Sequence, residues 1–457
     1  MGQALGRVSR VVLMRPLTIA LCLHGYFPDQ FFGTAVYARQ LAEALQRRGN
    51  RVVIVVPRFD ASLDHPRLSE PEWLGGIEIR RILRPRMRGM RDTFDDPRLM
   101  PLLRETFSAI GADIVHLAHF LGLGTALFAT AKSLNLPIFA TLTDFHGFCH
   151  RGTLLNSWGL TCKGPNRWRT NCVSCGLRDY ADEQPQSWTL AYLASWFARP
   201  TSAITLPLLT EVLPRQSGDD IRAIRQRPDR LFDEFTTIRA AIAPTRHLHD
   251  AYRRNGFAMP MDVQPFGIDA DRSAKPPRQS DRLRIGFIGQ IGKHKGSHIL
   301  LAAARHLPVD RVAIRIWGDM DRNPPYAASL RSAAWGLDVA FPGPLALEEI
   351  DAALRETDVL VLPSLWAENA PLVLLQALAT HTPCLVSDQP GMTEFVRNGV
   401  NGYAFPTGNA RALAARIRHL ADDRTHLAKL TTQTAYERSS DDMAADAMDL
   451  YSRHGIA

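Results

Sequence analysis

The chain has 457 residues, of which 46% are hydrophobic and 22% charged, a composition that is typical of a soluble globular protein and excludes a wholly disordered chain. At roughly 100–200 residues per domain, the length predicts two or three domains. Lys and Arg number 54 against 46 Asp and Glu, an excess too small in so long a chain to identify an anionic partner.

The first half of the chain has the pattern of a doubly wound α/β domain. Residues 18–23 form an apolar run, residues 35–48 place apolar side chains at helical spacing, and residues 51–56 are apolar after the first position. A strand, a helix and a second strand in this order make a βαβ unit, which implies a parallel sheet. Further strands are expected at 114–117, 138–142 and 241–243.

This pattern is interrupted and then restarts. Residues 149–239 hold a cysteine cluster and a polar, helical segment, so we expect a helical, cysteine-containing insertion there. Residues 267–282 are polar and contain two adjacent prolines, which predicts the domain boundary. Strands are then expected at 284–288, 313–317, 338–341, 359–362 and 384–387, with helices at 297–306, 373–379 and 444–454. We therefore predict an α/β protein with Rossmann-like domains over residues 15–270 and 281–440 and a last helix within 441–457.

One stretch, residues 114–131, contains no Asp, Glu, Lys or Arg and is long enough to suggest a membrane span. Two histidines and two glycines interrupt it, so we interpret it as a buried strand, a turn and a buried helix. Residues 11–14 are too short an apolar run for a secretory signal. We expect a soluble, cytoplasmic protein.

The turn at residues 289–296 (GQIGKHKG) lies between an expected strand and an expected helix. Its glycines allow close backbone approach, a helix N-terminus attracts anions, and Lys295 adds a positive charge, which indicates a phosphate site. The glycine spacing excludes both the dinucleotide and the P-loop fingerprint. A tight turn with solvated lysines is the alternative.

A second turn, residues 363–372 (PSLWAENAPL), places Glu368 where a strand ends and a helix begins. The backbone amides of Asn369, Ala370 and Leu372 could hold a phosphate oxygen there, and Glu368 could accept hydrogen bonds from sugar hydroxyls. A helix-capping carboxylate is the alternative role for Glu368.

These motifs resemble those of a known family. In the C-terminal half FIGQIGKHKG, VLPSLWAENAPLVLLQALATHTPCLVSD and GMTEFVRNGVNGYAFP, and in the N-terminal half TIALCLHGYFP and FFGTAVYARQLAEALQRRGNRVVIVVP, are similar to the retaining family 4 glycosyltransferases of the GT-B fold (glycosyl transferases group 1). The resemblance covers nearly the full chain, apart from about residues 176–239. It implies two facing Rossmann-like domains with a cleft between them, a nucleotide-sugar donor, retention of anomeric configuration and no catalytic metal.

The resemblance also implies roles for individual residues. Lys295 is expected on the donor diphosphate and Glu368 against the donor sugar, which makes these two the catalytic candidates. The other donor-binding candidates are Gly33, Gln290, Phe341, Gly343, Asn369, Ala370, Pro371, Leu372 and Gln376. Tyr451 and the last helix are expected to cross back onto the N-terminal domain.

Three positions depart from the pattern of that family. The family's second glutamate is Gln376 here, an arginine of its first turn is Gln290, and a histidine of its N-terminal domain is Thr143. An amide still bonds to a hydroxyl but without charge assistance, so Gln376→Glu is expected to keep or strengthen donor binding. Because of these three departures, a non-catalytic subunit that binds a sugar nucleotide is an alternative function.

Four of the six cysteines fall within residues 149–175, with the spacing C-x12-C-x9-C-x2-C. Four thiolates suit a tetrahedral zinc ion, and a metal would explain how a segment without apolar periodicity folds. Free or disulfide-paired thiols and an iron–sulfur cluster are the alternatives, and His146 or His150 could replace a thiol. We predict a structural zinc site made by Cys149, Cys162, Cys172 and Cys175.

Polar residues after two N-terminal strands are candidates for the acceptor side: His116, His119, Thr143 and Asp144. A buried histidine with satisfied hydrogen bonds is the alternative for His116 and His119. Separately, residues 80–91 contain six arginines and no acidic residue. A solvated face is the simplest interpretation, and contact with an anionic membrane surface is the functional one. Nucleic acid is not expected, because no aromatic-rich binding module accompanies the arginines.

The sequence as a whole predicts a retaining glycosyltransferase that moves a sugar from a nucleoside-diphosphate sugar to a glycan or lipid-linked acceptor in polysaccharide or glycoconjugate synthesis. Its expected location is the cytoplasm, with peripheral contact at the inner face of the membrane. A nucleotide-sugar epimerase or hydrolase of the same fold is the enzymatic alternative.

Overall fold

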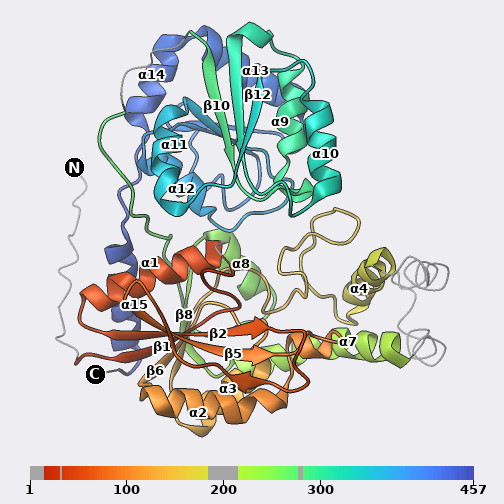
Figure 1. Ribbon diagram of the computed structural model, residues 1–457, viewed down its shortest axis with the longest axis vertical. Helices are drawn as coiled ribbons and strands as arrows, with labels where there is room; N and C mark the ends of the chain where they lie inside the picture. Colours follow the sequence, from red (N-terminus) through yellow and green to blue (C-terminus); the bar gives the residue numbers. More distant parts are fainter. Residues whose placement is uncertain (1–14, 31–32, 184–214, 276–280, 457) are drawn as a thin grey trace.

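The computed structural model describes residues 15–30, 33–183, 215–275 and 281–456, and they form two β-sheets, one in each half of the chain (Figure 1). The first half lies at the bottom of Figure 1 and the second half at the top, with α15 at the C-terminus packed against the first half. The predicted α/β class with two parallel-sheet domains is confirmed.

The N-terminal sheet has the strand order β3-β5-β2-β1-β6-β7-β8-β9, with β4 paired to β5. Its parallel strands are β1 (Thr18–Cys22), β2 (Arg51–Phe59), β5 (Ile77–Arg84), β6 (Ile114–Leu117), β7 (Ile138–Thr141), β8 (Ile238–Ala243) and β9 (Met261–Val263). The short strands β3 (Arg67–Leu68) and β4 (Glu72–Leu74) run antiparallel to β5.

Helices cover both faces of this sheet, and alternate residues of β1 therefore enter different cores. Ile19 and Leu21 pack with α1 (Gly33–Arg47) and α15 (Ser440–Arg453), whereas Ala20 and Cys22 pack with α2 (Met100–Ile110) and α3 (Gly124–Ser133). A strand covered on both faces is apolar throughout, which is why these strands were recognisable in the sequence. Helix α8 (Arg246–Arg254) follows β8.

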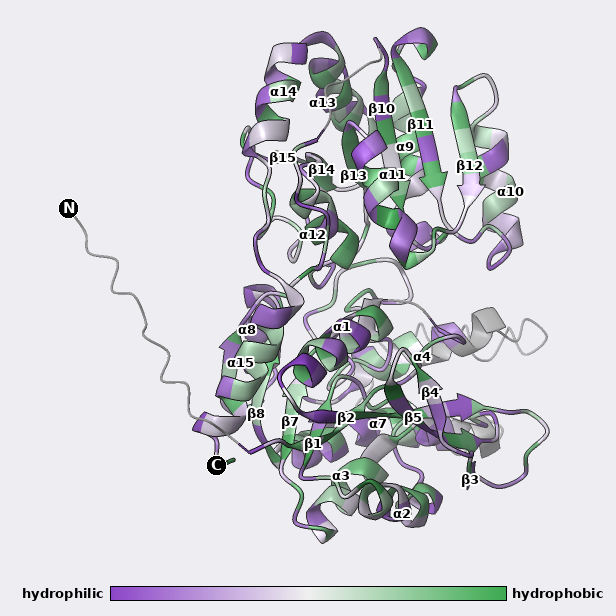
Figure 2. Ribbon diagram, turned by 60° about the vertical axis from the view of Figure 1, so that its left-hand side comes forward, coloured by the Kyte–Doolittle hydropathy of each residue, from purple (hydrophilic) through white to green (hydrophobic). Residues whose placement is uncertain are grey.

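The C-terminal sheet is entirely parallel, in the order β12-β11-β10-β13-β14-β15. Its strands are β10 (Leu283–Ile288), β11 (Val312–Trp317), β12 (Val339–Gly343), β13 (Val359–Leu362), β14 (Cys384–Ser387) and β15 (Gly402–Phe405). Its helices are α9 (Ser297–Ala304), α10 (Pro324–Ala333), α11 (Ile350–Glu356), α12 (Leu372–Ala379), α13 (Ala410–Asp422) and α14 (Arg424–Gln433). Figure 2 shows the apolar strands enclosed between helices in both sheets. Short 3-10 helices occupy Arg91–Thr93, Pro97–Leu99, Lys293–Lys295, Val309–Arg311 and Leu347–Glu349.

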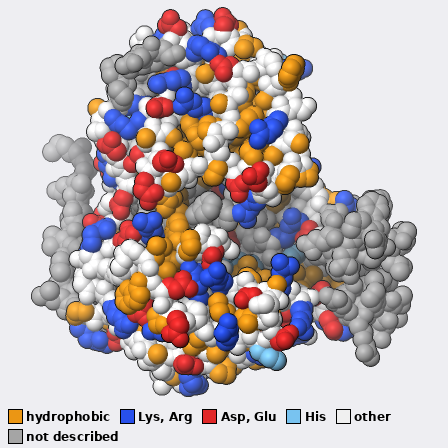
Figure 3. Space-filling model, viewed as in Figure 1, with side chains coloured by type: hydrophobic (Ala, Val, Ile, Leu, Met, Phe, Trp, Pro, Cys, Tyr) orange, Lys and Arg blue, Asp and Glu red, His pale blue; other side chains and the backbone are white. Residues whose placement is uncertain are grey.

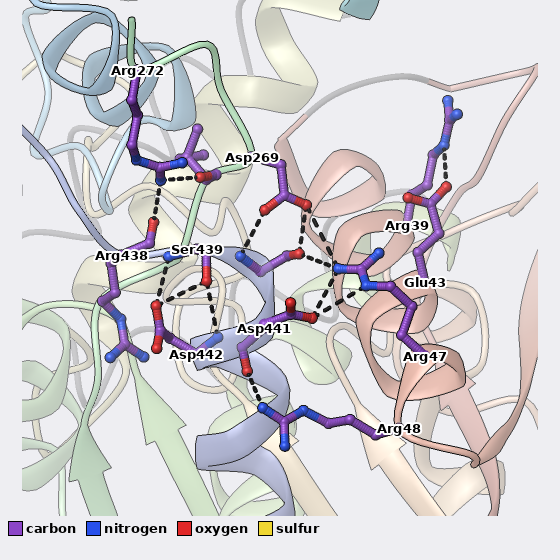
Figure 4. Close-up of polar contacts among 12 residues, drawn as sticks. Arg39, Glu43, Arg47, Arg48, Asp269, Arg272, Arg438, Ser439, Asp441 and Asp442 are labelled. Carbon is purple, nitrogen blue, oxygen red and sulfur yellow. Dashed lines mark hydrogen bonds and ion pairs between the residues drawn. The ribbon is translucent and has the colours of Figure 1, made fainter.

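The chain crosses between the two domains twice, and the two crossings touch. The Ile268 amide donates to the Arg438 carbonyl at 2.8 Å, and a Cβ on Gly267 would lie 1.7 Å from the Ser439 carbonyl oxygen, so this approach requires glycine. In Figure 4, Arg47 of α1 points at Asp269, in the first crossing, and at Asp441, in the first turn of α15 just after the second crossing. These contacts hold the two crossings against each other and against α1.

The last helix packs onto the N-terminal domain through Met443, Ala444, Ala447, Leu450 and Tyr451. This agrees with the crossing back that the resemblance implied.

The insertion is irregular over residues 149–169 and then helical. Its described elements are an isolated bridge between Leu155 and Thr161, helix α4 (Thr170–Glu183) and helix α7 (Arg215–Phe235). Helices α4 and α7 contact each other and extend to the right of the N-terminal sheet in Figure 1. The predicted insertion also included residues 184–214, which lie outside the described residues.

The first three arginines of the arginine-rich segment, Arg80, Arg81 and Arg84, lie in a strand, β5, that the sequence did not predict. Arg81 and Arg84 are each 1% exposed, and their partners are Asp29 and Glu72 for Arg81 and Asp96 for Arg84. Arg81 and Arg84 therefore do not belong to a solvated or membrane-facing surface, because a buried, paired guanidinium offers no free charge to a lipid headgroup. Arg86, Arg88 and Arg91 are exposed, and their contact with an anionic membrane surface stays a prediction. On the face shown in Figure 3, basic and acidic side chains are interspersed.

Residues 114–131 form β6, a turn and α3, as expected for a buried segment. Within the described ranges, none of the helices combines the length and the apolar character that crossing a bilayer demands.

Candidate functional site

The two catalytic candidates meet in an ion pair. Lys295 ends the 3-10 turn between β10 and α9, and Glu368 lies between β13 and α12. Strands β10 and β13 are neighbours, so their following loops emerge at the same edge of the sheet. Lys295 Nζ lies 2.7 Å from Glu368 Oε1, with side chains 22% and 6% exposed.

Two further donors bind the same oxygen of Glu368. Ser364 Oγ donates at 2.6 Å and Trp366 Nε1 at 2.9 Å. The ammonium of Lys295 also lies 5.2 Å from the centre of the Trp366 ring, a cation–π contact. The motif thus holds its carboxylate with three donors, and neither Ser364 nor Trp366 was singled out from the sequence, although both lie within the same ten-residue motif.

A glycine from another loop fixes the backbone of Glu368. Gly391 has φ +82°, and a Cβ there would lie 1.7 Å from the Glu368 carbonyl oxygen. Only glycine adopts this conformation and allows this approach without strain. The loop after β14 therefore packs directly against the backbone of Glu368, a contact that one sequence alone does not reveal.

The residues after Glu368 contact the N-terminal domain. Asn369 Nδ2 donates to the Thr143 carbonyl at 2.7 Å, and Thr245 Oγ1 donates to Asn369 Oδ1 at 3.0 Å. Thr143 follows β7 and Thr245 follows β8, so the carboxyl ends of the two sheets meet at Asn369. The Thr143 hydroxyl is turned away, because it donates to the Ala118 carbonyl at 3.0 Å.

Ala370, Pro371 and Leu372 lead into α12. Ala370 is buried with φ +52°, and Pro371 precedes the first helical residue, Leu372. The amides at such a helix start lack intrahelical partners, which makes them donors to an anion. Whether they contact a donor phosphate stays a prediction.

The other donor-binding candidates come from both domains. Gly33 opens α1, is exposed, and would have no other atom within 4 Å if it carried a Cβ, which leaves room for a ligand. Gln290 lies two residues after the end of β10 and is partly buried. Phe341 and Gly343 belong to β12, two strands away from β10, with the Phe341 ring 5.7 Å from the Arg331 guanidinium. The structure does not bring Phe341 and Gly343 into contact with the Lys295–Glu368 pair.

Gln376 lies in the second turn of α12 and has a partner of its own. Its Nε2 donates to Asp351 Oδ1 at 2.7 Å, and Asp351 Oδ2 accepts from the Asp271 amide at 2.7 Å. A glutamate at this position would face a second carboxylate. An amide at position 376 can donate to Asp351, which a carboxylate cannot do. Contact of Gln376 with the ribose of a donor stays a prediction.

His116 does not line the acceptor side, contrary to the prediction. Its side chain is fully buried, with Nδ1 2.6 Å from the Tyr451 hydroxyl and Nε2 3.0 Å from Thr141 Oγ1. Burial lowers the pKa of His116 to about 3, so the imidazole is neutral. His116 anchors α15 to the sheet, and its partner comes from the far end of the chain.

His119 and Asp144 do pair at the carboxyl ends of β6 and β7. His119 Nε2 lies 2.9 Å from Asp144 Oδ2, and its Nδ1 accepts from the Leu121 amide at 3.0 Å. Although burial opposes it, the contact with His119 and a hydrogen bond from the His146 amide hold the pKa of Asp144 below its usual range. Both nitrogens of His119 are engaged, so this histidine positions Asp144.

Two more histidines join this cluster and were not acceptor candidates. The rings of His24 and His146 lie 4.2 and 4.9 Å from that of His119. Burial lowers the pKa of His24 to about 3, and its Nδ1 has no hydrogen-bond partner among the described residues. His24 follows β1, so the same strand-end signal that selected His119 could have selected it.

The four clustered cysteines line one cavity of about 390 Å³ in the insertion. All four are free thiols, so the disulfide alternative is not what the structure has. Only Cys175 lies in a tight group of metal-type donors, and its companions there are His150 and Asp179.

Comparison with known proteins gives the same family for both halves of the chain. The model of glycosyl transferases group 1 matches residues 269–438, and the model of glycosyltransferase family 4 matches residues 32–172. The chain belongs to the family 4, group 1 glycosyltransferases. The suspected family is thus confirmed.

The curated relatives of this family 4 protein match it over part of their length. The putative colanic acid biosynthesis glycosyltransferase WcaL of Salmonella typhimurium is 30% identical over 170 residues, which are 34% of this chain and 40% of that protein. The phosphatidyl-myo-inositol mannosyltransferase of Mycobacterium leprae is 31% identical over 159 residues, 33% and 41% of the two chains. The matches span less than half of these relatives.

Solved structures of similar fold match over almost the whole chain. HepE of Anabaena, in complex with UDP and glucose, has a TM-score of 0.62 at 13% identity and covers 95% of this chain and 99% of its own. The catalytic domain of starch synthase IV from Arabidopsis thaliana, bound to ADP and acarbose, has a TM-score of 0.63 at 15% identity, over 96% and 99%. The predicted GT-B fold is confirmed.

Proposed function

We propose that this protein is a retaining glycosyltransferase that transfers a sugar from a nucleoside-diphosphate sugar to a glycan or lipid-linked acceptor in polysaccharide or glycoconjugate synthesis. The observation that carries the proposal is the Lys295–Glu368 pair, held at 2.7 Å beside the start of α12. Family membership and the sugar-transferring activities in the names of its relatives support it.

In the proposed reaction, breakage of the bond between the donor sugar and the diphosphate leaves negative charge on the leaving diphosphate. Lys295 and the amides that begin α12 are placed to stabilise that charge. Glu368 would accept hydrogen bonds from the hydroxyls of the sugar, so donor binding would draw Lys295 from the carboxylate toward the phosphate. The acceptor hydroxyl would attack on the face that the diphosphate vacates, which retains the configuration, and would pass its proton to the departing diphosphate oxygen.

The chemistry assigned to these residues needs no catalytic metal. Lys295 supplies the positive charge that a divalent cation would otherwise supply to a diphosphate. This part of the proposal predicts transfer in the presence of a chelator.

A binding subunit without catalysis is the second candidate. It is favoured by Gln290, which lacks the charge that the family often has, and by Thr143, whose hydroxyl is occupied by the Ala118 carbonyl. An epimerase or hydrolase of the same fold would act without an acceptor.

The test begins with thermal unfolding in the presence of uridine, guanosine and adenosine diphosphates and their sugars, because a ligand that binds the folded state raises the melting temperature. The stabilising donor is then incubated with and without saccharide and polyprenyl-phosphate acceptors. Acceptor-dependent product with the donor's anomeric configuration is expected. Donor binding without turnover would favour the binding subunit, and turnover that ignores the acceptor would favour the epimerase or hydrolase.

A further inference from the structure

The cavity in the insertion is built from one short stretch of chain. Every residue that lines it falls within 148–175, and the lining combines apolar side chains with the four thiols and His150. Residues 149–169 have almost no regular secondary structure, with one isolated bridge between Leu155 and Thr161. A segment of this kind gains little from hydrogen-bonded ladders and needs another source of order.

Three different metal-type donors converge beside this cavity, and two of them, His150 and Cys175, line it. One donor atom each from His150, Cys175 and Asp179 lies within 4.8 Å of the others. The His150 side chain is 8% exposed, and its Nε2, 3.7 Å from Asp179 Oδ2, has no hydrogen-bond partner among the described residues. A buried imidazole nitrogen without a partner, aimed at a thiol and a carboxylate, is the arrangement that a metal ion would satisfy.

The groups around these donors orient them as the outer contacts of a metal site do. Asp179 Oδ1 accepts from Arg151 Nη1 at 2.8 Å and from Ser157 Oγ at 2.9 Å, which leaves Oδ2 toward His150. Ser157 Oγ also lies 3.0 Å from Cys175 Sγ. Ligating carboxylates and thiolates are commonly held by such second contacts.

A buried arginine supplies the matching charge. Arg227 is 1% exposed, its Nη2 donates to the His146 carbonyl at 2.6 Å, and its Nε and Nη1 have no hydrogen-bond partner among the described residues. Arg227 belongs to α7, which packs against α4, the helix that carries Cys172, Cys175 and Asp179. Two thiolates, a carboxylate and a divalent cation carry one net negative charge, which a buried guanidinium would balance.

We propose that this cavity binds one zinc-class ion through Cys175, His150 and Asp179, with a thiolate of Cys149, Cys162 or Cys172 as the fourth ligand. Tetrahedral zinc with bonds of about 2.0–2.3 Å places its donor atoms about 3.3–3.8 Å apart. His150 Nε2 and Asp179 Oδ2 are already 3.7 Å apart, and since no pair in the group exceeds 4.8 Å, any other pair needs to approach by at most about 1 Å. Four protein ligands leave no open position, so the ion is structural. The inference is independent of the proposed transferase activity.

This ligand set differs from the four-cysteine site predicted from the sequence. That set assigned all four ligands to thiols, whereas the structure gathers a histidine and a carboxylate around one of them. Asp179 lies four residues after Cys175, one helical turn along α4, and was not considered from the sequence because the cysteine spacing alone suggested the site.

The test measures metal directly in the full chain. Protein purified without chelator is expected to hold about one zinc per chain by elemental analysis. After removal of zinc and addition of Co²⁺ alone, the thiolate-to-cobalt absorption should correspond to two bound thiolates. His150→Ala and Asp179→Asn should each weaken zinc binding at least tenfold in competition with a chromophoric chelator. Cys384→Ser, in the buried strand β14, is the matched thiol control and should keep the zinc.

Three outcomes would overturn the proposal: native protein that contains no zinc and titrates with the four clustered thiols, an iron–sulfur absorption spectrum, or a four-thiolate cobalt spectrum that His150→Ala and Asp179→Asn leave unchanged. Because Cys175 is buried, Cys175→Ser does not separate loss of metal from loss of fold, so the conclusion rests on Asp179→Asn, whose partly exposed side chain tolerates an amide. Its melting temperature, measured with and without zinc, shows whether loss of metal or loss of fold explains a negative result.

Discussion

Replacing Lys295 and Glu368 separately should show that they act on different parts of the donor, Lys295 on the diphosphate and Glu368 on the sugar. Lys295→Met removes the ammonium from the carboxylate but leaves Ser364 and Trp366 bonded to Glu368 Oε1. Glu368→Gln keeps the size of the side chain and removes the charge. Lys293→Met changes an exposed lysine in the same 3-10 turn and is the matched control.

The expected magnitudes follow from burial. An exposed ion pair contributes about 0–1 kcal/mol, and breaking a buried one costs about 3–5 kcal/mol. With 22% of the Lys295 side chain and 6% of the Glu368 side chain exposed, Lys295→Met should lower the free energy of unfolding by an intermediate amount, about 2–3 kcal/mol. Loss of a charged contact of about 1.5–3 kcal/mol should weaken nucleoside-diphosphate binding by about 10–100-fold.

Glu368→Gln should act differently, because the carboxylate competes with the diphosphate for Lys295. Affinity for the nucleoside diphosphate should be unchanged or higher, while the transfer rate falls by about 100-fold or more. Titration calorimetry with the diphosphate selected by thermal shift, and transfer rates at saturating donor, measure the two effects. Equal loss of diphosphate affinity in both variants, or a loss in Lys293→Met as large as in Lys295→Met, would refute the assignment of the two residues to different parts of the donor.

Three further predictions concern residues whose roles the structure revised. Gln376→Glu places a second carboxylate opposite Asp351, so the variant should bind the donor more weakly at pH 7.5, and its donor affinity should recover near pH 5, where one carboxyl is protonated. Calorimetric titrations at the two pH values measure the affinity, and stronger binding at pH 7.5 would contradict the geometry. Tyr451→Phe leaves His116 Nδ1 buried without its 2.6 Å partner and should cost about 1–3 kcal/mol in urea unfolding, whereas a change below about 0.5 kcal/mol would show that the hydrogen bond does not hold α15. Burial lowers the pKa of His24 and His116 to about 3, so below about pH 6.5 these two side chains bind more protons in the unfolded chain than in the folded one. Lowering the pH from 7.5 to 5.5 should therefore reduce the free energy of unfolding by about 1.4 kcal/mol for each histidine. Equal free energies of unfolding at the two pH values would disprove that the two side chains are neutral in the folded protein.

The sequence predicted those parts of the fold whose signal is local. The expected strands at 114–117, 359–362 and 384–387 coincide with β6, β13 and β14, since a parallel strand covered on both faces is an uninterrupted apolar run. The meeting of Lys295 and Glu368 was also predictable, because both follow strands of one parallel sheet. The loops that follow neighbouring parallel strands emerge at the same edge of the sheet, whatever their sequences are.

The misjudged residues are polar groups whose partners are distant in sequence. His116 bonds to Tyr451, 335 residues later, and no local pattern separates such a histidine from one that lines a ligand site. The alternation of Ile77 and Ile79 before the arginines did carry a strand signal, but the charges obscured it. Arg84 is buried because Asp96 is there to pair with it, and pairing is a tertiary fact.

Asn369 connects the site to the arrangement of the domains. Its backbone belongs to the loop that is proposed to hold the donor, yet its side chain bonds to Thr143 and Thr245 of the other domain. Separating the domains would break both hydrogen bonds, so the position of the donor loop and the closeness of the domains are energetically coupled. This gives Thr143 a function that does not need the histidine implied at this position by the family resemblance: the carbonyl, present in every residue, makes the contact.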